Sequence, residues 1–176
     1  MSVDLVPLLQ ALVAIDSTSS RSNLPVLDLL EAEARALGFD CRRMRWRDAA
    51  GVEKGNLVCR KGPEAAGGLA LVGHTDCVPF DPEWKEALSG GLRDGRVTGR
   101  GAADTKGSLA AMLSALRRLV TKMGTPPCSI GLLAACDEEH GFGGAPAGLR
   151  PQAAVVAQAG WTVQGLLLPG FGLQIA

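Results

Sequence analysis

The sequence reads Gly68-Leu69-Ala70-Leu71-Val72-Gly73-His74-Thr75-Asp76 shortly before its midpoint. Its first six residues form a continuous apolar run, which is typical of a strand buried on both faces of a sheet. His74 and Asp76 follow this run at once. An imidazole and a carboxylate are therefore expected at the carboxyl end of a buried strand.

A helix and a second buried strand follow further along the chain. Apolar residues recur at helical spacing over residues 106–120, and Gly124 ends that helix. Residues 129–136 are again apolar and lead directly into Asp137-Glu138-Glu139. The strand, helix, strand order predicts a right-handed crossover and parallel pairing of the two strands. Ligands bind beyond the carboxyl ends of such strands, so the two polar clusters are expected to converge.

The N-terminal third supplies further helices and strands. Apolar stripes predict one helix over residues 4–15, and a second that Asn23 caps and Gly38 ends. Residues 39–46 and 56–60 are predicted strands, and the polar loop between them suits an antiparallel connection. Together these elements predict an α/β fold with a mixed, largely parallel sheet flanked by helices.

The composition favours a globular protein that acts on a small molecule. Hydrophobic residues make up 47% of the 176 residues and charged residues 20%, so one domain with a proper core is expected. The 18 basic and 18 acidic residues cancel, which argues against nucleic acid or an anionic membrane as a partner. The sequence shows neither a signal-peptide pattern nor an apolar stretch of membrane-spanning length.

The cysteines indicate a reducing compartment. Their number is odd, they are widely spaced and no CxxC pair occurs, so reduced thiols in a cytoplasmic protein are expected. The five are Cys41, Cys59, Cys77, Cys128 and Cys136.

Arg150 is the last charged residue of the sequence. Residues 151–176 contain no charged residue, yet they include apolar groups such as Leu166-Leu167-Leu168 that would be unfavourable in water. Two interpretations are open: a partner covers this tail, or the tail is not native-like.

Three clusters carry the candidate chemistry. His74 could ligate a metal ion while Asp76 fixes the imidazole tautomer, although a hydrogen-bonded loop pair is the simpler interpretation. Asp104, at the start of a helix, could cap that helix or bridge two metal ions about 3.5–4 Å apart. Glu138 and Glu139 repel each other unless a cation lies nearby, with a solvated acidic turn as the alternative. One of the two could be a ligand and the other a general base.

Other residues near these clusters have simpler interpretations. Arg100 and Lys106 are expected to be surface charges rather than substrate contacts. Trp46 and Trp84 are expected to pack against neighbours. His140 lies in a glycine-rich loop and is not expected to bind a metal ion.

The clusters and the segments between them resemble the M20 family of metallopeptidases and deacylases over residues 68–144. The matching motifs are His74-Thr75-Asp76, Val78-Pro79-Phe80, Trp84, Asp94-Gly95-Arg96-Val97-Thr98-Gly99-Arg100-Gly101, Asp104-Thr105-Lys106-Gly107 and Asp137-Glu138-Glu139. The Gly-His-Thr-Asp-x-Val-Pro-Phe form with a nearby tryptophan is most similar to the acetylornithine deacetylases of that family.

The resemblance implies an amide hydrolase that uses two zinc or cobalt ions. In that assignment His74 and Glu139 are terminal metal ligands, Asp104 bridges both ions, Glu138 is the general base and Asp76 orients His74. The implied reaction removes an acyl group, such as acetate, from an N-acyl amino acid, as in arginine biosynthesis. Succinyl-diaminopimelate desuccinylase, aminoacylase and carboxypeptidase activities are alternatives within the family.

The sequence also departs from the family pattern. The family has a further glutamate ligand where Gln158 stands here, and a neutral amide is a poor zinc ligand. The family also has a late histidine ligand and a separate lid or dimerisation domain that makes a homodimer, and this sequence contains neither. We therefore expect residues 1–150 to be the N-terminal portion of the catalytic domain and residues 151–176 to be a divergent tail. Incomplete metal binding and little hydrolysis are expected, and the alternative is a non-catalytic fragment with an apolar interaction tail.

Overall fold

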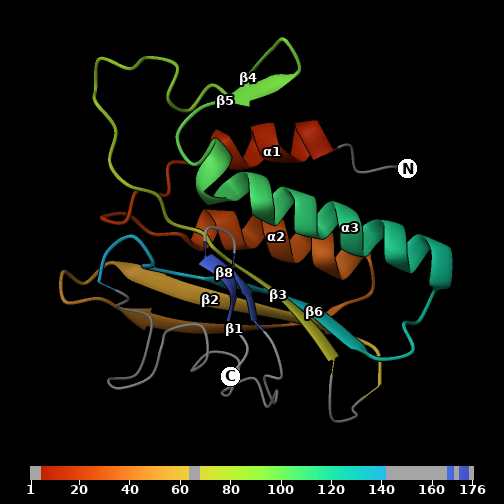
Figure 1. Ribbon diagram of the computed structural model, residues 1–176. Helices are drawn as coiled ribbons and strands as arrows, with labels where there is room; N and C mark the ends of the chain where they lie inside the picture. Colours follow the sequence, from red (N-terminus) through yellow and green to blue (C-terminus); the bar gives the residue numbers. More distant parts are fainter. Residues whose placement is uncertain (1–4, 64–67, 142–165, 169–170, 175–176) are drawn as a thin grey trace.

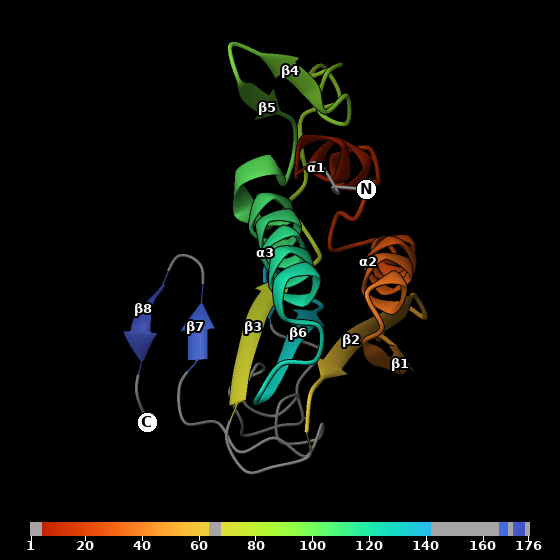
Figure 2. The ribbon, with the colours of Figure 1, turned by 90° about the vertical axis from the view of Figure 1, so that its right-hand side faces the viewer.

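A computed structural model gives the fold of the chain and describes residues 5–63, 68–141, 166–168 and 171–174 (Figure 1). These residues form a six-stranded sheet and a separate two-stranded ribbon. The helices of the described part lie on one face of the sheet (Figures 1 and 2). None of these helices has both the length and the apolar character needed to cross a membrane.

In the described residues two helices come first, followed by five strands, a π-helical turn with a third helix, and three further strands. The helices are α1 (Leu5–Val13), α2 (Leu24–Ala36) and α3 (Gly107–Met123), and a π-helical turn, η1 (Ala102–Lys106), leads into α3. The strands are β1 (Asp40–Arg47), β2 (Glu53–Lys61), β3 (Gly68–His74), β4 (Gly91–Arg93), β5 (Arg96–Thr98), β6 (Ser129–Ala135), β7 (Leu166–Leu168) and β8 (Phe171–Gln174).

The main sheet is mixed, as predicted, with the strand order β1-β2-β6-β3-β7-β8 (Figure 2). The strand β3 pairs in parallel with β6 and with β7. The pairs β1–β2, β2–β6 and β7–β8 are antiparallel, so the prediction of a largely parallel sheet is wrong. The short connection from β1 to β2 permits only antiparallel pairing, whereas α3 provides the crossover that parallel β3 and β6 require.

The two apolar runs differ in how they are buried. The strand β6 is buried along its whole length. In β3 only Val72, Gly73 and His74 are buried, and Leu69 is 51% exposed, so the predicted burial on both faces holds only near the carboxyl end. That end is covered because α3 starts there: a Cβ on Gly73 would lie 3.0 Å from Leu109 of α3.

The hydrophobic core lies between the sheet and the helices α2 and α3. α1 contributes its buried face to the same core, and in Figure 1 it lies on the far side of α3 from the sheet. The core residues include Leu12, Leu27, Leu30, Leu57, Leu109, Leu113, Leu132 and Ala134. The predicted helices and strands are confirmed in type, with ends that differ by a few residues.

Asn23 does not act as the predicted helix cap. It lies directly before α2, but its backbone is helical and its side chain makes no capping hydrogen bond. Instead its Nδ2 donates to the Gly55 carbonyl at 2.8 Å and to Thr75 Oγ1 at 2.7 Å, and its Oδ1 accepts from the Gly55 N–H at 3.0 Å. This buried side chain therefore joins the start of α2 to β2 and to the segment after β3.

Replacing Asn23 by alanine is expected to lower the free energy of unfolding by about 2–4 kcal/mol, because three hydrogen bonds are lost and buried polar groups of Gly55 stay unpaired. Urea unfolding would measure this loss. Ser20→Ala is the matched control, since Ser20 is exposed in the same loop and should change stability by less than about 0.5 kcal/mol. An equal loss of stability in the Asn23→Ala and Ser20→Ala proteins would contradict the stabilising role given to the Asn23 hydrogen bonds.

Candidate metal centre

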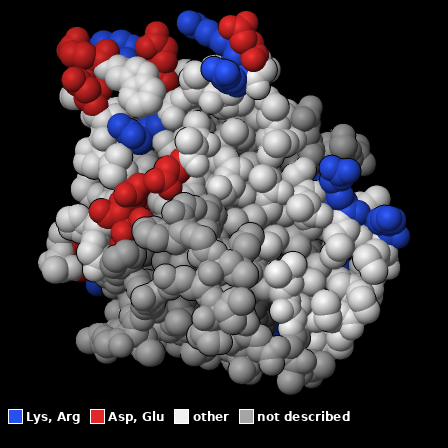
Figure 3. All heavy atoms as spheres, viewed as in Figure 1, with Lys and Arg blue, Asp and Glu red and all other residues white. Residues whose placement is uncertain are grey.

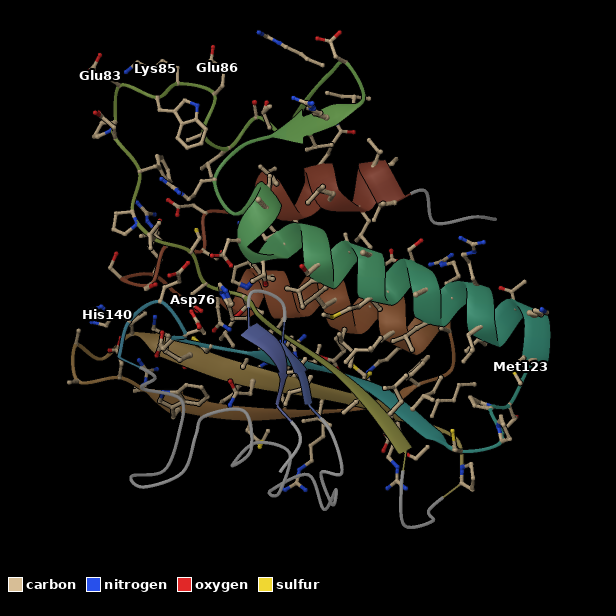
Figure 4. All side chains as sticks on the ribbon, viewed as in Figure 1. Asp76, Glu83, Lys85, Glu86, Met123 and His140 are labelled. Carbon is tan, nitrogen blue, oxygen red and sulfur yellow. The ribbon has the colours of Figure 1, made fainter. Side chains whose placement is uncertain are left out.

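Three separate segments meet at one end of the sheet. His74 is the last residue of β3, Glu138 and Glu139 follow β6, and Asp104 lies in η1 before α3. Figure 4 shows Asp76 at this end, where the chain leaves β3 and the segment after β6 passes close by. The predicted convergence of the first and third clusters is therefore confirmed, and the second cluster joins them.

The candidate metal ligands predicted from the sequence lie together. His74, Asp104 and Glu139 each offer one donor atom, and these atoms all lie within 4.8 Å of one another. The imidazole Nε2 is 3.0 Å from Asp104 Oδ1 and 3.9 Å from Glu138 Oε2. The Asp104 side chain is 73% exposed, and α3 has no side-chain cap, so its carboxylate is not occupied in capping.

The orientation of His74 is set mainly by the backbone. Its Nδ1 lies 3.0 Å from the main-chain carbonyl oxygen of Asp76 and 3.6 Å from that residue's carboxylate Oδ1. A carbonyl can only accept, so Nδ1 carries the proton when the imidazole is neutral and Nε2 presents its lone pair to the cluster. The sequence interpretation had assigned this orienting role to the Asp76 carboxylate.

The Asp76 carboxylate also holds the acidic turn. It accepts hydrogen bonds from the backbone N–H of Glu138 and of Glu139, both at 3.1 Å, and from the Ser19 hydroxyl at 2.9 Å. Burial alone would raise the pKa of Asp76, but the neighbouring His74 imidazole, the Ser19 hydroxyl and the Glu139 N–H lower it. Asp76 thus ties the segment after β3 to the segment that carries the two glutamates.

A buried lysine supports the same turn from β2. Lys54 is 1% exposed, and its ammonium group donates to the carbonyls of Ser19 and Arg21 and to Asp137 Oδ1 at 3.0 Å. Asp137 has a left-handed backbone, with φ of 59°, immediately before Glu138. Sequence reasoning missed Lys54 and Ser19, because no spacing links residues 19, 54 and 137.

The second basic residue flagged from the sequence, Lys106, is also buried. It was predicted to be a surface charge, but it is 0% exposed and its ammonium group donates to the Ile15 carbonyl at 2.6 Å. Burial lowers the pKa of Lys106. The prediction was wrong because the helix pattern of residues 106–120 could not show that α1 covers the start of α3.

The aromatic and remaining polar candidates among the described residues lie outside the ligand cluster. Arg100 is half-buried with its guanidinium carbon 5.4 Å from the Trp84 ring centroid, and Phe80 meets the same ring edge-on. Trp84 nevertheless remains 37% exposed. His140 is exposed and lies outside the ligand cluster, further out along the same edge (Figure 4). Gln158 lies outside the described residues.

The cluster carries more negative charge than its own residues balance. Burial alone would lower the pKa of His74, but the nearby carboxylate of Asp76, together with the carboxylates of Asp104 and Glu138, raises that pKa to about 9. Burial raises the pKa of Glu139, and the charges of Asp104 and Glu138 act in the same direction. Figure 3 shows acidic side chains as a continuous strip on this face of the molecule.

This donor set fits a divalent metal ion. Zinc is bound in proteins by imidazole nitrogen and carboxylate oxygen, and the cluster offers one imidazole and two carboxylates from three segments. A cation would also relieve the repulsion among the acidic groups. A site of this kind, beyond the carboxyl ends of the parallel strands β3 and β6, is typical of a metal-dependent hydrolase.

The chain belongs to peptidase family M20/M25/M40. Residues 70–167, more than half of the chain, match this family. Acetylornithine deacetylase of Myxococcus xanthus is 46% identical over 148 residues, which cover 81% of this chain and 38% of the relative. Succinyl-diaminopimelate desuccinylase of Rhodospirillum rubrum is 37% identical over 145 residues, which cover 77% of this chain and 36% of the relative. The chain thus spans less than two fifths of the length of either relative.

Solved structures have the same fold. An M20 family metallo-carboxypeptidase from Sulfolobus solfataricus superposes with a TM-score of 0.72 at 22% identity, over 96% of this chain and 38% of its own. Human carnosine dipeptidase 1 superposes with a TM-score of 0.70 at 20% identity, over 93% of this chain and 37% of its own. At these identities the likeness concerns the fold alone.

Proposed function

We propose that the chain carries part of the active site of a zinc- or cobalt-dependent hydrolase that removes an acetyl group from an N-acetylated amino acid such as N-acetylornithine. The observation that carries the proposal is the convergence of His74, Asp104 and Glu139, with Glu138 beside them. The 46% identity to an acetylornithine deacetylase supports acetyl over succinyl as the acyl group. The cytoplasm is the proposed location, supported by the free state of all five cysteines.

His74 and Glu139 would each hold one metal ion, and Asp104 would bridge both. When bound, the ions supply Lewis acidity, which polarises the amide carbonyl and lowers the pKa of a water molecule. Glu138 would take the proton from that water and pass it to the leaving amine nitrogen as the amide bond breaks. Asp76 would keep Glu138 and Glu139 in place through their backbone N–H groups.

Residues 151–176 are proposed to be a divergent tail beyond this partial catalytic domain. Two observations concern the position at which this tail begins. The family match continues to residue 167, and Leu166–Leu168 pairs with β3 in parallel.

Replacing Glu138 by glutamine is expected to separate catalysis from metal binding. Whatever rate of acetate release the protein reaches with zinc should fall about 100- to 10,000-fold, because a glutamine cannot accept the proton. The zinc affinity should stay unchanged, since Glu138 is not one of the proposed ligands. An acetate-release assay on N-acetylornithine and isothermal titration with zinc would measure the two effects.

Glu83→Gln is the matched control, because Glu83 is exposed on the loop that carries Trp84 (Figure 4). Glu83→Gln should alter neither the rate of acetate release nor the zinc affinity. A Glu138→Gln protein that releases acetate at the unaltered rate would exclude Glu138 as the base.

A desuccinylase is the second candidate, because several relatives at 33–38% identity are succinyl-diaminopimelate desuccinylases. Parallel assays of acetate and succinate release distinguish the two. Faster release of succinate would replace the deacetylase proposal. A protein that binds zinc through this cluster and releases neither acid would favour the non-catalytic alternative.

A further inference from the structure

Two cysteines face each other across the hairpin at the edge of the sheet. Cys41 on β1 lies directly opposite Cys59 on β2 in the antiparallel register. Their Sγ atoms are 3.0 Å apart and share a hydrogen bond. Both thiols are free and buried, Cys41 at 7% and Cys59 at 0% exposure. Neither residue belongs to the ligand cluster.

We propose that Cys41 and Cys59 form an oxidisable pair that a peroxide converts to a cross-strand disulfide. A disulfide requires Cα atoms about 4.4–6.8 Å apart. Residues directly opposite each other in an antiparallel pair have Cα atoms about 4.5–5.5 Å apart, which falls within that range. The bond can therefore form between strands that are already paired, without a change of register.

Cys41 is the thiol that reacts first. It lies on β1, the outermost strand of the sheet, and an Nη of Arg35 donates to its carbonyl at 2.7 Å, which brings a positive charge near the sulfur. Because Cys59 can donate its S–H to a Cys41 thiolate, the pKa of Cys41 is lowered and that of Cys59 is raised. The thiolate is the reactive form of cysteine.

The oxidation balances with peroxide as the only other reactant. The Cys41 thiolate attacks one peroxide oxygen, the O–O bond breaks, and Cys41 becomes a sulfenic acid while hydroxide leaves. The Cys59 sulfur then attacks the Cys41 sulfur, the S–O bond breaks and the S–S bond forms. The thiol proton and the hydroxyl group leave as water. The hydroxide from the first step takes up the proton that Cys41 lost on ionising. Two thiols are thus oxidised and one hydrogen peroxide is reduced to two water molecules.

The other described cysteines have different surroundings. The Cys77 sulfur is 3.9 Å from the Ser17 hydroxyl, and the Cys136 thiol donates to Asp137 Oδ1 at 3.2 Å. Cys128 is exposed and is available for reaction between molecules rather than within one. The proposed disulfide is therefore specific to the β1–β2 hairpin.

The test treats the folded chain with hydrogen peroxide, alkylates it with N-ethylmaleimide after unfolding, and digests it with trypsin. Two of the five thiols should escape alkylation. The tryptic fragments 36–42 and 55–60 should be linked, with a mass two hydrogens below their sum. Dithiothreitol should restore both thiols.

Two variants make the outcome specific. Cys128→Ser should retain the linked fragments, and Cys41→Ser should leave Cys59 fully alkylated. Recovery of both fragments in the alkylated form from the unaltered chain would overturn the proposal. So would an equal yield of disulfides among the other cysteines.

Discussion

Replacing Asp104 by asparagine is expected to weaken zinc binding roughly 100-fold while leaving the fold intact. Loss of residues that merely orient metal ligands costs about 10- to 100-fold in affinity, and loss of a ligand charge should cost at least as much. A neutral amide is a poor zinc ligand. The side chain of Asp104 is 73% exposed, so the free energy of unfolding should change by less than about 0.5 kcal/mol.

Isothermal titration with zinc, with thermal unfolding of the same samples, measures both quantities. Asp94→Asn is the matched control: Asp94 is exposed in the turn between β4 and β5, and its left-handed backbone, with φ of 50°, is one that asparagine tolerates. This control substitution removes one negative charge, as Asp104→Asn does, but from a residue outside the ligand cluster. Equal loss of affinity in both variants would mean that zinc responds to net charge rather than to this cluster.

Replacing Lys54 by methionine is expected to lower the free energy of unfolding by about 3–5 kcal/mol. That is the usual cost of removing one partner of a buried ion pair, because the other charge stays buried and uncompensated. Here Asp137 would keep its charge in a site where its side chain is 6% exposed. The carbonyls of Ser19 and Arg21 would lose a donor as well.

The double variant Lys54→Met with Asp137→Asn should regain part of this stability, since it removes both charges. Lys122→Met is the control, because Lys122 is exposed in the last turn of α3 and should change stability by less than about 0.5 kcal/mol. Zinc affinity of the folded Lys54→Met protein should fall about 10-fold, because the acidic turn loses its support. Urea unfolding that finds Lys54→Met as stable as Lys122→Met would refute the role given to the ion pair.

The main elements and the position of the site could be predicted from the sequence because the relevant signals are local. The helical stripe over residues 106–120 and the apolar run of residues 129–136 each specify one element. The polar residues that follow the two apolar runs must then lie at the carboxyl end of the sheet. That rule places His74 near Glu138 and Glu139 without knowledge of any side-chain contact.

The support beneath the site could not be predicted in the same way. Lys54 stands between Glu53 and Gly55 in a segment that looks solvent-exposed, and its partner Asp137 lies 83 residues further along the chain. Lys106 is likewise buried, and it donates to the carbonyl of Ile15, 91 residues earlier in the chain. The burial of a charged residue depends on such distant partners, and hydrophobic periodicity carries no information about them.

The antiparallel pairing of β2 with β6 was missed for a related reason. The pairing of β2 with β6 joins segments about 75 residues apart, and nothing in either strand specifies that they run in opposite directions. The role of Asp76 also depended on long-range contacts. Its carboxylate meets the N–H groups of Glu138 and Glu139 more than 60 residues away, whereas sequence spacing pointed only to the nearby His74.

The central claim is that His74, Asp104 and Glu139 form one metal centre. Anomalous diffraction from crystals grown with zinc, recorded above and below the zinc absorption edge, tests it most directly. The account predicts two anomalous peaks, one about 2.0–2.2 Å from His74 Nε2 and the other about 2.0–2.2 Å from an oxygen of Glu139, each also within that distance of an Asp104 oxygen. A chain that binds zinc with its peak elsewhere, for example at the exposed Cys128, would contradict it.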